Sequence, residues 1–140
     1  MYRFLEATAG QYMTRTVITV ARALSLRELG EMIKRDDFNT YPVVEDGGVV
    51  GVVTKFDMLK CFALAPSQMV PRYGDLMNRT VGDVMVADFI YVRPDTRLTR
   101  VLQLMVEHRI RGIPVIDGPS LAGIIAREDV LKALEAAADE

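Results

Sequence analysis

Two aspartates, Asp57 and Asp129, occupy equivalent positions in two similar stretches of the sequence, 72 residues apart. Each follows two short apolar runs separated by a glycine-containing turn, a pattern that predicts two strands and then the start of a helix. An ionised carboxylate offers two acceptor oxygens, so it can bind donors of a ligand as well as donors of the protein. Both aspartates are therefore candidate binding residues.

A purely structural role also fits these positions. Thr54 and Asp57 have the spacing of a helix capping box, in which the hydroxyl accepts from an early backbone N–H and the acid reaches back toward the cap. Such a cap is worth roughly 1 kcal/mol and needs no ligand. Ala126 stands where the second copy would need a hydroxyl, so reciprocal capping does not explain Asp129, although the helix dipole still favours an acid there. Both interpretations of Asp57 stay open at this point.

Cations near the end of a predicted helix invite a phosphate-binding interpretation. They are His108, Arg109 and Arg111. The end of a helix is also where cations offset the dipole of the carbonyl groups. The pattern favours a functional role for Arg111, and a solvated position for His108 and Arg109.

The elements that must position these residues recur in one order, which is strand, helix, strand, strand, helix. The fold class is α/β (α+β), with two repeats that we expect to pack around a pseudo-two-fold axis. Ser25 is expected to cap the first long helix, and Gly47 or Gly48 to adopt positive φ in the first hairpin. Apolar residues at spacings of three and four predict the buried helix faces: Leu26, Leu29, Met32 and Ile33; Met58, Leu59 and Phe62; Leu98, Val101, Leu104 and Met105; Val130, Leu131 and Leu134.

The predicted boundaries are a helical appendage over 1–11, a first repeat over 12–66, a connector over 67–82 and a second repeat over 83–138. Within the appendage, Tyr2, Leu5 and Ala9 share one helical side, and Gly10 is expected to end the helix. Two prolines and a glycine mark residues 65–74 as connecting chain. One repeat alone buries too little apolar area, so both should form one compact module.

Composition narrows the classes of function. The chain has 140 residues, half of them apolar, with a net charge of −2, so no basic field favours nucleic acid. No apolar stretch approaches the roughly 18 residues of a membrane span, and the first residues do not form a secretion signal, which favours a cytoplasmic protein. Cys61 and His108 are the single cysteine and histidine, so no Cys/His metal cluster is expected, and Cys61 is predicted to pack in a helix.

With this repeat in hand, the sequence resembles a tandem pair of CBS domains, a Bateman module, as a stand-alone protein. The match covers about residues 12–136. The segments that carry it are Tyr12-Met13, Tyr41-Pro42-Val43-Val44, Gly51-Val52-Val53-Thr54-Lys55-Phe56-Asp57, Val84-Met85, Gly112-Ile113-Pro114-Val115-Ile116-Asp117 and Gly123-Ile124-Ile125-Ala126-Arg127-Glu128-Asp129.

The resemblance implies ligand sites, because in this family a Thr/Ser-x-x-Asp carboxylate holds a ribose and the strand residues frame an adenine. Carried over by position, the first site uses Ile18, Tyr41, Pro42, Thr54 and Asp57, and the second uses Ile90, Ile113, Pro114 and Asp129. Arg111 stands where relatives place a basic residue that meets phosphates. Further phosphate candidates are Lys55, Arg109 and Arg127. Ala126 departs from the family pattern, so the first site is expected to be the stronger, and Asp57→Ala to weaken binding more than Asp129→Ala.

The resemblance also implies a regulatory module without catalytic activity that senses AMP, ADP or ATP, usually as a homodimer that acts on an effector protein. The few cations favour AMP or ADP over ATP and leave S-adenosylmethionine or another adenosyl ligand open. No cofactor or metal is required. A competing hypothesis is a structural dimerisation or partner-docking module without a nucleotide response. A small enzyme is disfavoured, because the chain has no Ser/His or Cys/His arrangement and no phosphate-binding glycine loop.

Overall fold

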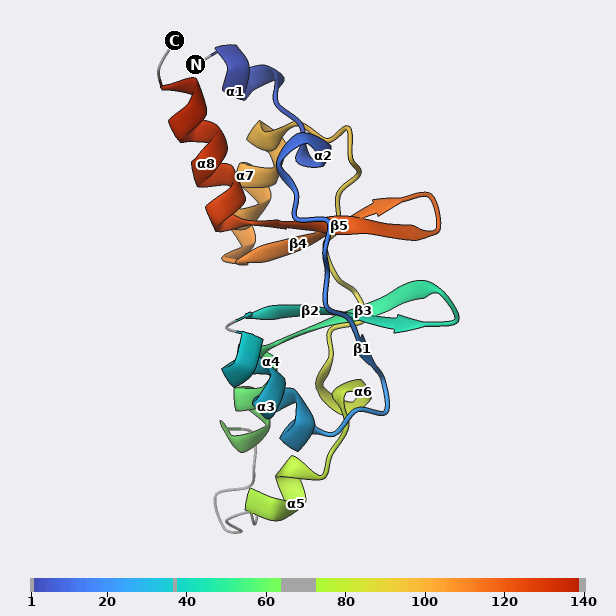
Figure 1. The fold of residues 1–140 in the computed structure, drawn as a ribbon. Helices are drawn as coiled ribbons and strands as arrows, with labels where there is room; N and C mark the ends of the chain where they lie inside the picture. The colour runs from blue at the N-terminus through green and yellow to red at the C-terminus, as the bar shows by residue number, and fades with distance from the viewer. Residues whose placement is uncertain (1, 37, 64–72, 139–140) are drawn as a thin grey trace. The chain divides into compact units, whose positions relative to one another are not determined.

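The computed structural model describes residues 2–36, 38–63 and 73–138. Its contacts divide the chain into two compact units. The contiguous unit is Ile18–Phe89, whereas the composite unit combines Met1–Val17 with Ile90–Glu140. Helices and strands alternate in both units (Figure 1), so the mixed α/β fold class is confirmed.

The contiguous unit contains a three-stranded sheet in the order β1-β2-β3. Strand β1 pairs parallel with β2, and β2 pairs antiparallel with β3. Helices α3 and α4 lie on one side of this sheet (Figure 1). The elements are β1 (Val20–Ala21), α3 (Leu26–Asp36), β2 (Thr40–Glu45), β3 (Gly48–Thr54), α4 (Lys55–Ala63), α5 (Tyr73–Met77) and α6 (Val81–Val84).

The composite unit has the same plan around a two-stranded hairpin. Its leading strand is reduced to one parallel bridge between Val92 and Val115, the counterpart of the pairing of Val20 with Val43. The elements are α1 (Tyr2–Glu6), α2 (Ala9–Tyr12), α7 (Leu98–His108), β4 (Gly112–Asp117), β5 (Ser120–Ala126) and α8 (Arg127–Ala137). The predicted element order holds, with a shortened first strand.

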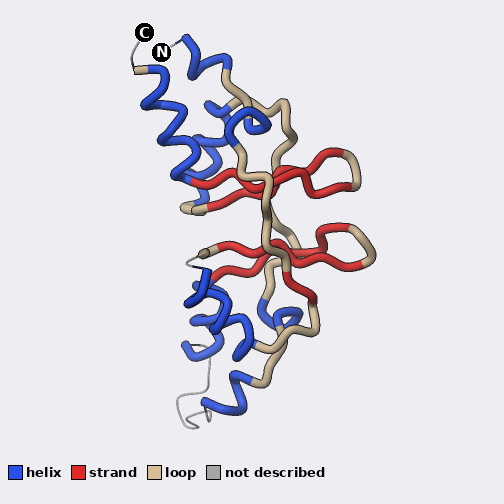
Figure 2. Tube along the Cα trace, viewed as in Figure 1, coloured by secondary structure: helices blue, strands red, loops and turns tan. Residues whose placement is uncertain are grey.

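Both hairpins turn through two residues, and Figure 2 shows them as paired strands. In the first, Asp46 and Gly47 have φ of 51° and 81°, as a type I′ turn requires. Gly47, one of the two glycines expected at positive φ, therefore fills this position. In the second hairpin Gly118 has φ of 60°. Both ladders shift register at the same place, next to Val43 in one and Val115 in the other.

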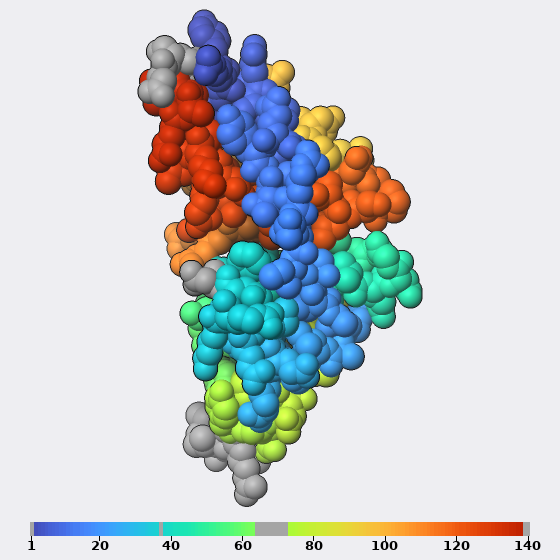
Figure 3. Space-filling view, in the orientation of Figure 1, coloured from blue at the N-terminus to red at the C-terminus, as the bar shows by residue number. Residues whose placement is uncertain are grey.

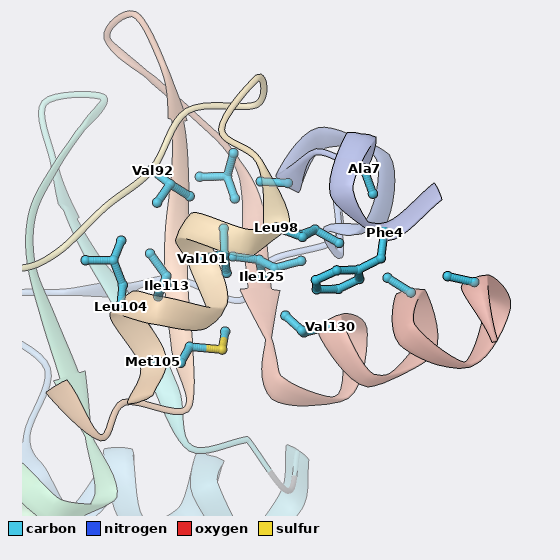
Figure 4. Packing of buried hydrophobic residues seen from close by; sticks show 14 residues of the cluster. Phe4, Ala7, Val92, Leu98, Val101, Leu104, Met105, Ile113, Ile125 and Val130 are labelled. Atoms are coloured by element: carbon cyan, nitrogen blue, oxygen red, sulfur yellow. The ribbon is translucent and has the colours of Figure 1, made fainter. Parts of the chain in front are cut away.

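Each unit has its own apolar core. The predicted face of α7 is buried in the composite core, where Leu98, Val101 and Met105 meet strand residues and α8 (Figure 4). In the contiguous unit, Leu26, Leu29 and Ile33 of α3 are buried, and Met32 packs partly against them. Ser25 caps α3 as expected, because its hydroxyl accepts the backbone N–H of Glu28 at 3.1 Å. The three- and four-residue periodicity thus predicted both helix faces.

The predicted faces of the two closing helices were partly wrong. In α4, Leu59 and Phe62 are exposed while Asp57 and Cys61 are buried. In α8, Leu131 is exposed and Ala133 is buried, although Val130 is buried as predicted. In both helices the aspartate lies on the buried face, whereas an apolar pattern assigns a charged residue to solvent.

The N-terminal residues are part of the composite core. Phe4, Ala7 and Ala9 are buried there, whereas Tyr2 is 80% and Leu5 49% exposed. The prediction that Tyr2, Leu5 and Ala9 share one helical side was therefore wrong, because only Ala9 of the three is buried. The segment forms two short helices, and Gly10 lies within α2 instead of ending a helix. Figure 3 shows these residues, in dark blue, beside α8 in red.

Short extended segments cross over each hairpin. Thr14 N–H donates to Ile124 O at 2.8 Å, and Ile124 N–H donates back to Thr14 O at 2.9 Å. In the contiguous unit, Val52 and Val86 exchange the same pair of bonds at 2.9 and 2.8 Å. The part of the predicted connector over 67–72 lies outside the described residues, while α5 and α6 follow it and bury Leu76, Met77 and Val81.

Candidate functional site

Asp57 lies in the first turn of α4 with its side chain almost fully buried. Its Oδ2 accepts the backbone N–H of Thr54 at 2.9 Å and the Thr54 hydroxyl at 3.0 Å. The Asp57 N–H donates to Thr54 Oγ1 at 3.2 Å, which completes the capping box. The other oxygen, Oδ1, lies 3.1 Å from Lys60 Nζ. The carboxylate is therefore buried, ionically paired and at the beginning of a helix.

Asp129 has the same place in α8 but fewer partners. Its Oδ2 accepts the backbone N–H of Ala126 at 2.8 Å, so the acid caps its helix without any hydroxyl. The residue is 7% exposed, close to the 5% of Asp57. Each unit thus carries one buried carboxylate at the N-terminus of its closing helix.

The candidate cations are exposed on the surface. The Arg111 carbonyl accepts the Arg127 N–H at 3.1 Å, which brings Arg111 beside the start of α8. Arg127 Nε donates to Ile110 O at 3.1 Å. Arg109 and Arg127 line a groove of about 420 Å³ whose remaining lining is apolar and comes from α7 and α8. Asp129 does not line that groove. In the contiguous unit, exposed Lys55 begins α4.

The apolar candidates fall into two groups. Ile18 and Ile90 are half-buried, so part of each side chain can meet a ligand. The strand residues are buried and lie in the antiparallel ladders; they are Tyr41, Pro42, Ile113 and Pro114. Tyr41 and Ile113 contribute their side chains to the two cores. Of these apolar candidates, only Ile18 and Ile90 expose part of their surface to solvent.

Tyr41 carries a buried hydroxyl group without a hydrogen-bond partner among the described residues. Its ring packs near Phe38, with centroids 6.2 Å apart. Burial raises the pKa of the Tyr41 phenol above its usual value, with a smaller contribution in the same direction from the Asp36 carboxylate and an opposing one from Arg35. A buried polar atom without a partner costs folding free energy.

Replacing Tyr41 by phenylalanine is therefore expected to stabilise the protein, by about 1 kcal/mol. The wild type should also lose stability as the pH rises above about 10, because the unfolded phenol loses its proton before the folded one does. The Tyr41→Phe variant should lack that part of the decline. Urea unfolding at pH 8 and pH 10.5 measures both effects, and a Tyr2→Phe variant, changed at a tyrosine that is 80% exposed, is the control. A less stable Tyr41→Phe variant would contradict the prediction.

Sequence reasoning missed Lys60. It stands one turn after Asp57, a spacing at which opposite charges on a helix meet. Its ammonium also lies 5.6 Å from the centre of the Phe56 ring. The spacing was visible in the sequence, but Lys132 has the same spacing from Asp129, and no ion pair forms between these two described residues. The pattern alone does not distinguish the two cases.

Other reactive groups show no catalytic arrangement in the part of the chain that the structure describes. Cys61 is buried, as predicted, and its thiol donates to Met58 O at 2.8 Å. His108 ends α7 on the surface. No group of three or more metal-ligating side chains occurs among the residues described. None of the described helices has the length and apolar character needed to cross a membrane.

Two α/β units with one element order, each with a buried aspartate at the start of its closing helix, define a duplicated module. Residues 9–64 and 81–136 each match the CBS domain, and the chain belongs to the CBS domain family. The resemblance seen in the sequence is thereby confirmed.

Several relatives share this fold. The uncharacterized protein MJ1225 of Methanocaldococcus jannaschii is 28% identical over 125 residues, or 86% of this chain and 45% of its own. Its crystal structure superposes with a TM-score of 0.83 over 92% of this chain and 48% of that one, at 27% identity. The CBS domain-containing protein YhcV of Bacillus subtilis is 30% identical, over 84% of this chain and 79% of its own. CBSX2, solved in complex with AMP, has a TM-score of 0.78 and 28% identity, over 94% of this chain and 98% of that chain. The chain spans less than half the length of MJ1225 and of two other M. jannaschii relatives.

Proposed function

We propose that this chain is a non-catalytic regulatory module that binds adenosine nucleotides, with Asp57 and Asp129 as the ribose-binding carboxylates. The observation that carries the proposal is the recurrence of a buried carboxylate at the same place in both units. Burying a carboxylate is costly unless donors surround it, and the vicinal hydroxyls of a ribose are two donors in a suitable arrangement. The complex of CBSX2 with AMP supports the choice of ligand.

The base and the phosphate would be met by different groups. Half-buried Ile18 and Ile90 offer apolar surface to an adenine in their respective units. Arg111 offers an exposed guanidinium to a phosphate, with Lys55 as a cation of the contiguous unit. Single cations suit a mono- or diphosphate better than a triphosphate, so AMP and ADP are favoured over ATP, and S-adenosylmethionine is a further candidate.

A melting experiment tests the proposal. AMP should raise the melting temperature, because a ligand at about 100 times its Kd stabilises the native state by about 2.7 kcal/mol. The doubly substituted Asp57→Asn, Asp129→Asn protein should lose this response. An asparagine oxygen can still accept the N–H that caps each helix, so the variant keeps its caps and loses acceptors for the ribose. No shift of the wild type with millimolar AMP, ADP, ATP or S-adenosylmethionine would overturn the proposal.

A second candidate is a homodimer or partner-docking module without a nucleotide response. It is favoured by the apolar side chains exposed on the closing helices, which include Phe56, Leu59 and Leu131. Both aspartates already act as caps, so their recurrence alone does not exclude it. Measuring the mass in solution beside the AMP titration separates the two, because only this candidate combines a dimer with no melting shift.

A further inference from the structure

The two carboxylates differ in how much hydrogen-bonding capacity the protein leaves free. A carboxylate has about four lone-pair positions on its two oxygens. At Asp57 three are taken, by the Thr54 N–H, the Thr54 hydroxyl and the Lys60 ammonium. A vicinal diol brings two donors, so it cannot be accommodated at Asp57 until one protein donor leaves.

Lys60 is the donor that can leave. The Thr54 N–H is fixed by the backbone and its hydroxyl belongs to the capping box, whereas the Lys60 side chain is 42% exposed and flexible. Lys60 alone occupies Oδ1, and its position over the Phe56 ring favours keeping the ammonium there. An incoming diol therefore competes with Lys60.

Asp129 has no such competitor among the described residues. Only the Ala126 N–H donates to it, and its Oδ1 carries no protein partner there. Ala126 has no hydroxyl to occupy a further position. Lys132, the counterpart of Lys60, is exposed and does not pair with Asp129. A diol can thus bind the carboxylate of Asp129, a residue that is 7% exposed, without displacing any protein donor.

We propose that Lys60 is a competitive gate on the Asp57 site, and that a vicinal diol therefore fills the Asp129 site first. This inference rests on the proposed function, because it assumes that the aspartates receive a ribose. It reverses the order expected from Thr54 and Ala126 in the sequence. Thr54, which completes the family pattern, donates two hydrogen bonds to the Asp57 carboxylate. Ala126, which breaks the pattern, donates only its backbone N–H to Asp129 and leaves the other acceptor positions free.

Calorimetric titration with adenosine tests the gate, because adenosine has the diol but no phosphate that would respond to the charge of Lys60. Adenosine binding should persist in Asp57→Asn and be lost or strongly weakened in Asp129→Asn. In the Asp129→Asn background, Lys60→Met should lower the Kd at the remaining site roughly two- to fivefold, as expected for removing an ion pair whose lysine is 42% exposed. The matched change Lys132→Met, made in the Asp57→Asn background, should leave the Kd unchanged. Circular dichroism checks that each variant is folded, and 2′-deoxyadenosine, which lacks the diol, should bind more weakly.

Three other outcomes are informative. If Asp57→Asn removes the binding and Asp129→Asn keeps it, or if Lys60→Met leaves the Kd unchanged or raises it, the gate is overturned while nucleotide binding stands. If adenosine binds to no variant, the gate is also overturned. The AMP melting experiment then decides separately whether the proposed function survives.

Discussion

Replacing Gly123 by alanine is expected to destabilise the protein by about 3 kcal/mol. A Cβ at this position would lie 2.7 Å from the Thr14 carbonyl oxygen and 2.8 Å from Met13 Sδ. Thr14 is held there by its two backbone hydrogen bonds with Ile124, so the oxygen cannot move without breaking them. Urea unfolding measures the loss.

Two other glycines provide comparisons for this prediction. At Gly51 an added Cβ would lie 2.7 Å from Met85 Sδ, which belongs to a flexible side chain, and 3.1 Å from the Val86 carbonyl oxygen. That backbone contact is longer than the 2.7 Å to Thr14 O at Gly123, so Gly51→Ala should cost less than Gly123→Ala. At Gly48 the only atom of the described residues within 4 Å of an added Cβ is Glu45 O, at 3.9 Å, and Gly48→Ala should be nearly neutral. Equal stability of the Gly123 and Gly48 variants would contradict the close approach described for Gly123.

Replacing Phe4 by alanine is expected to cost about 3 to 5 kcal/mol, the usual range for removing a buried aromatic side chain. The ring lies in the composite core with Leu98 and Val130 (Figure 4), although it belongs to a helix of only five residues. Thermal and urea unfolding measure the effect. Leu5→Ala is the matched control, because Leu5 is 49% exposed on the same helix and should cost much less. If the two variants are equally stable, Phe4 does not support the core in solution.

The sequence predicted the structural features that depend on residues close together in the chain. The faces of α3 and α7 follow from apolar residues three and four positions apart, and the first hairpin turn from the positive φ that Gly47 tolerates. The closing helices were harder. Asp57 and Asp129 are charged residues on the buried side, and periodicity assigns a charge to solvent. In a helix as short as α1, two or three apolar residues do not define a face, so Phe4 was not distinguished from Leu5.

For the candidate site, the sequence indicated which residues to consider but not which contacts they make. Repetition at 72 residues pointed to both aspartates. It could not show that Lys60 pairs with its aspartate while Lys132 does not, because an ion pair depends on side-chain rotamers and surroundings that spacing leaves undetermined. Only the side-chain contacts in the structure show that Asp57 has more protein donors than Asp129.

The crossing of Thr14 over β5 also bears on the order in which the protein forms during synthesis. The contiguous unit is complete once residue 89 has emerged, so it can fold while the rest of the chain is still being made. The composite unit has to wait, since residues 1–17 find their hairpin partner only after β5 is synthesised. Until then Phe4 and Ala9 have no core to enter, and the nascent N-terminal segment exposes apolar surface that a chaperone can bind.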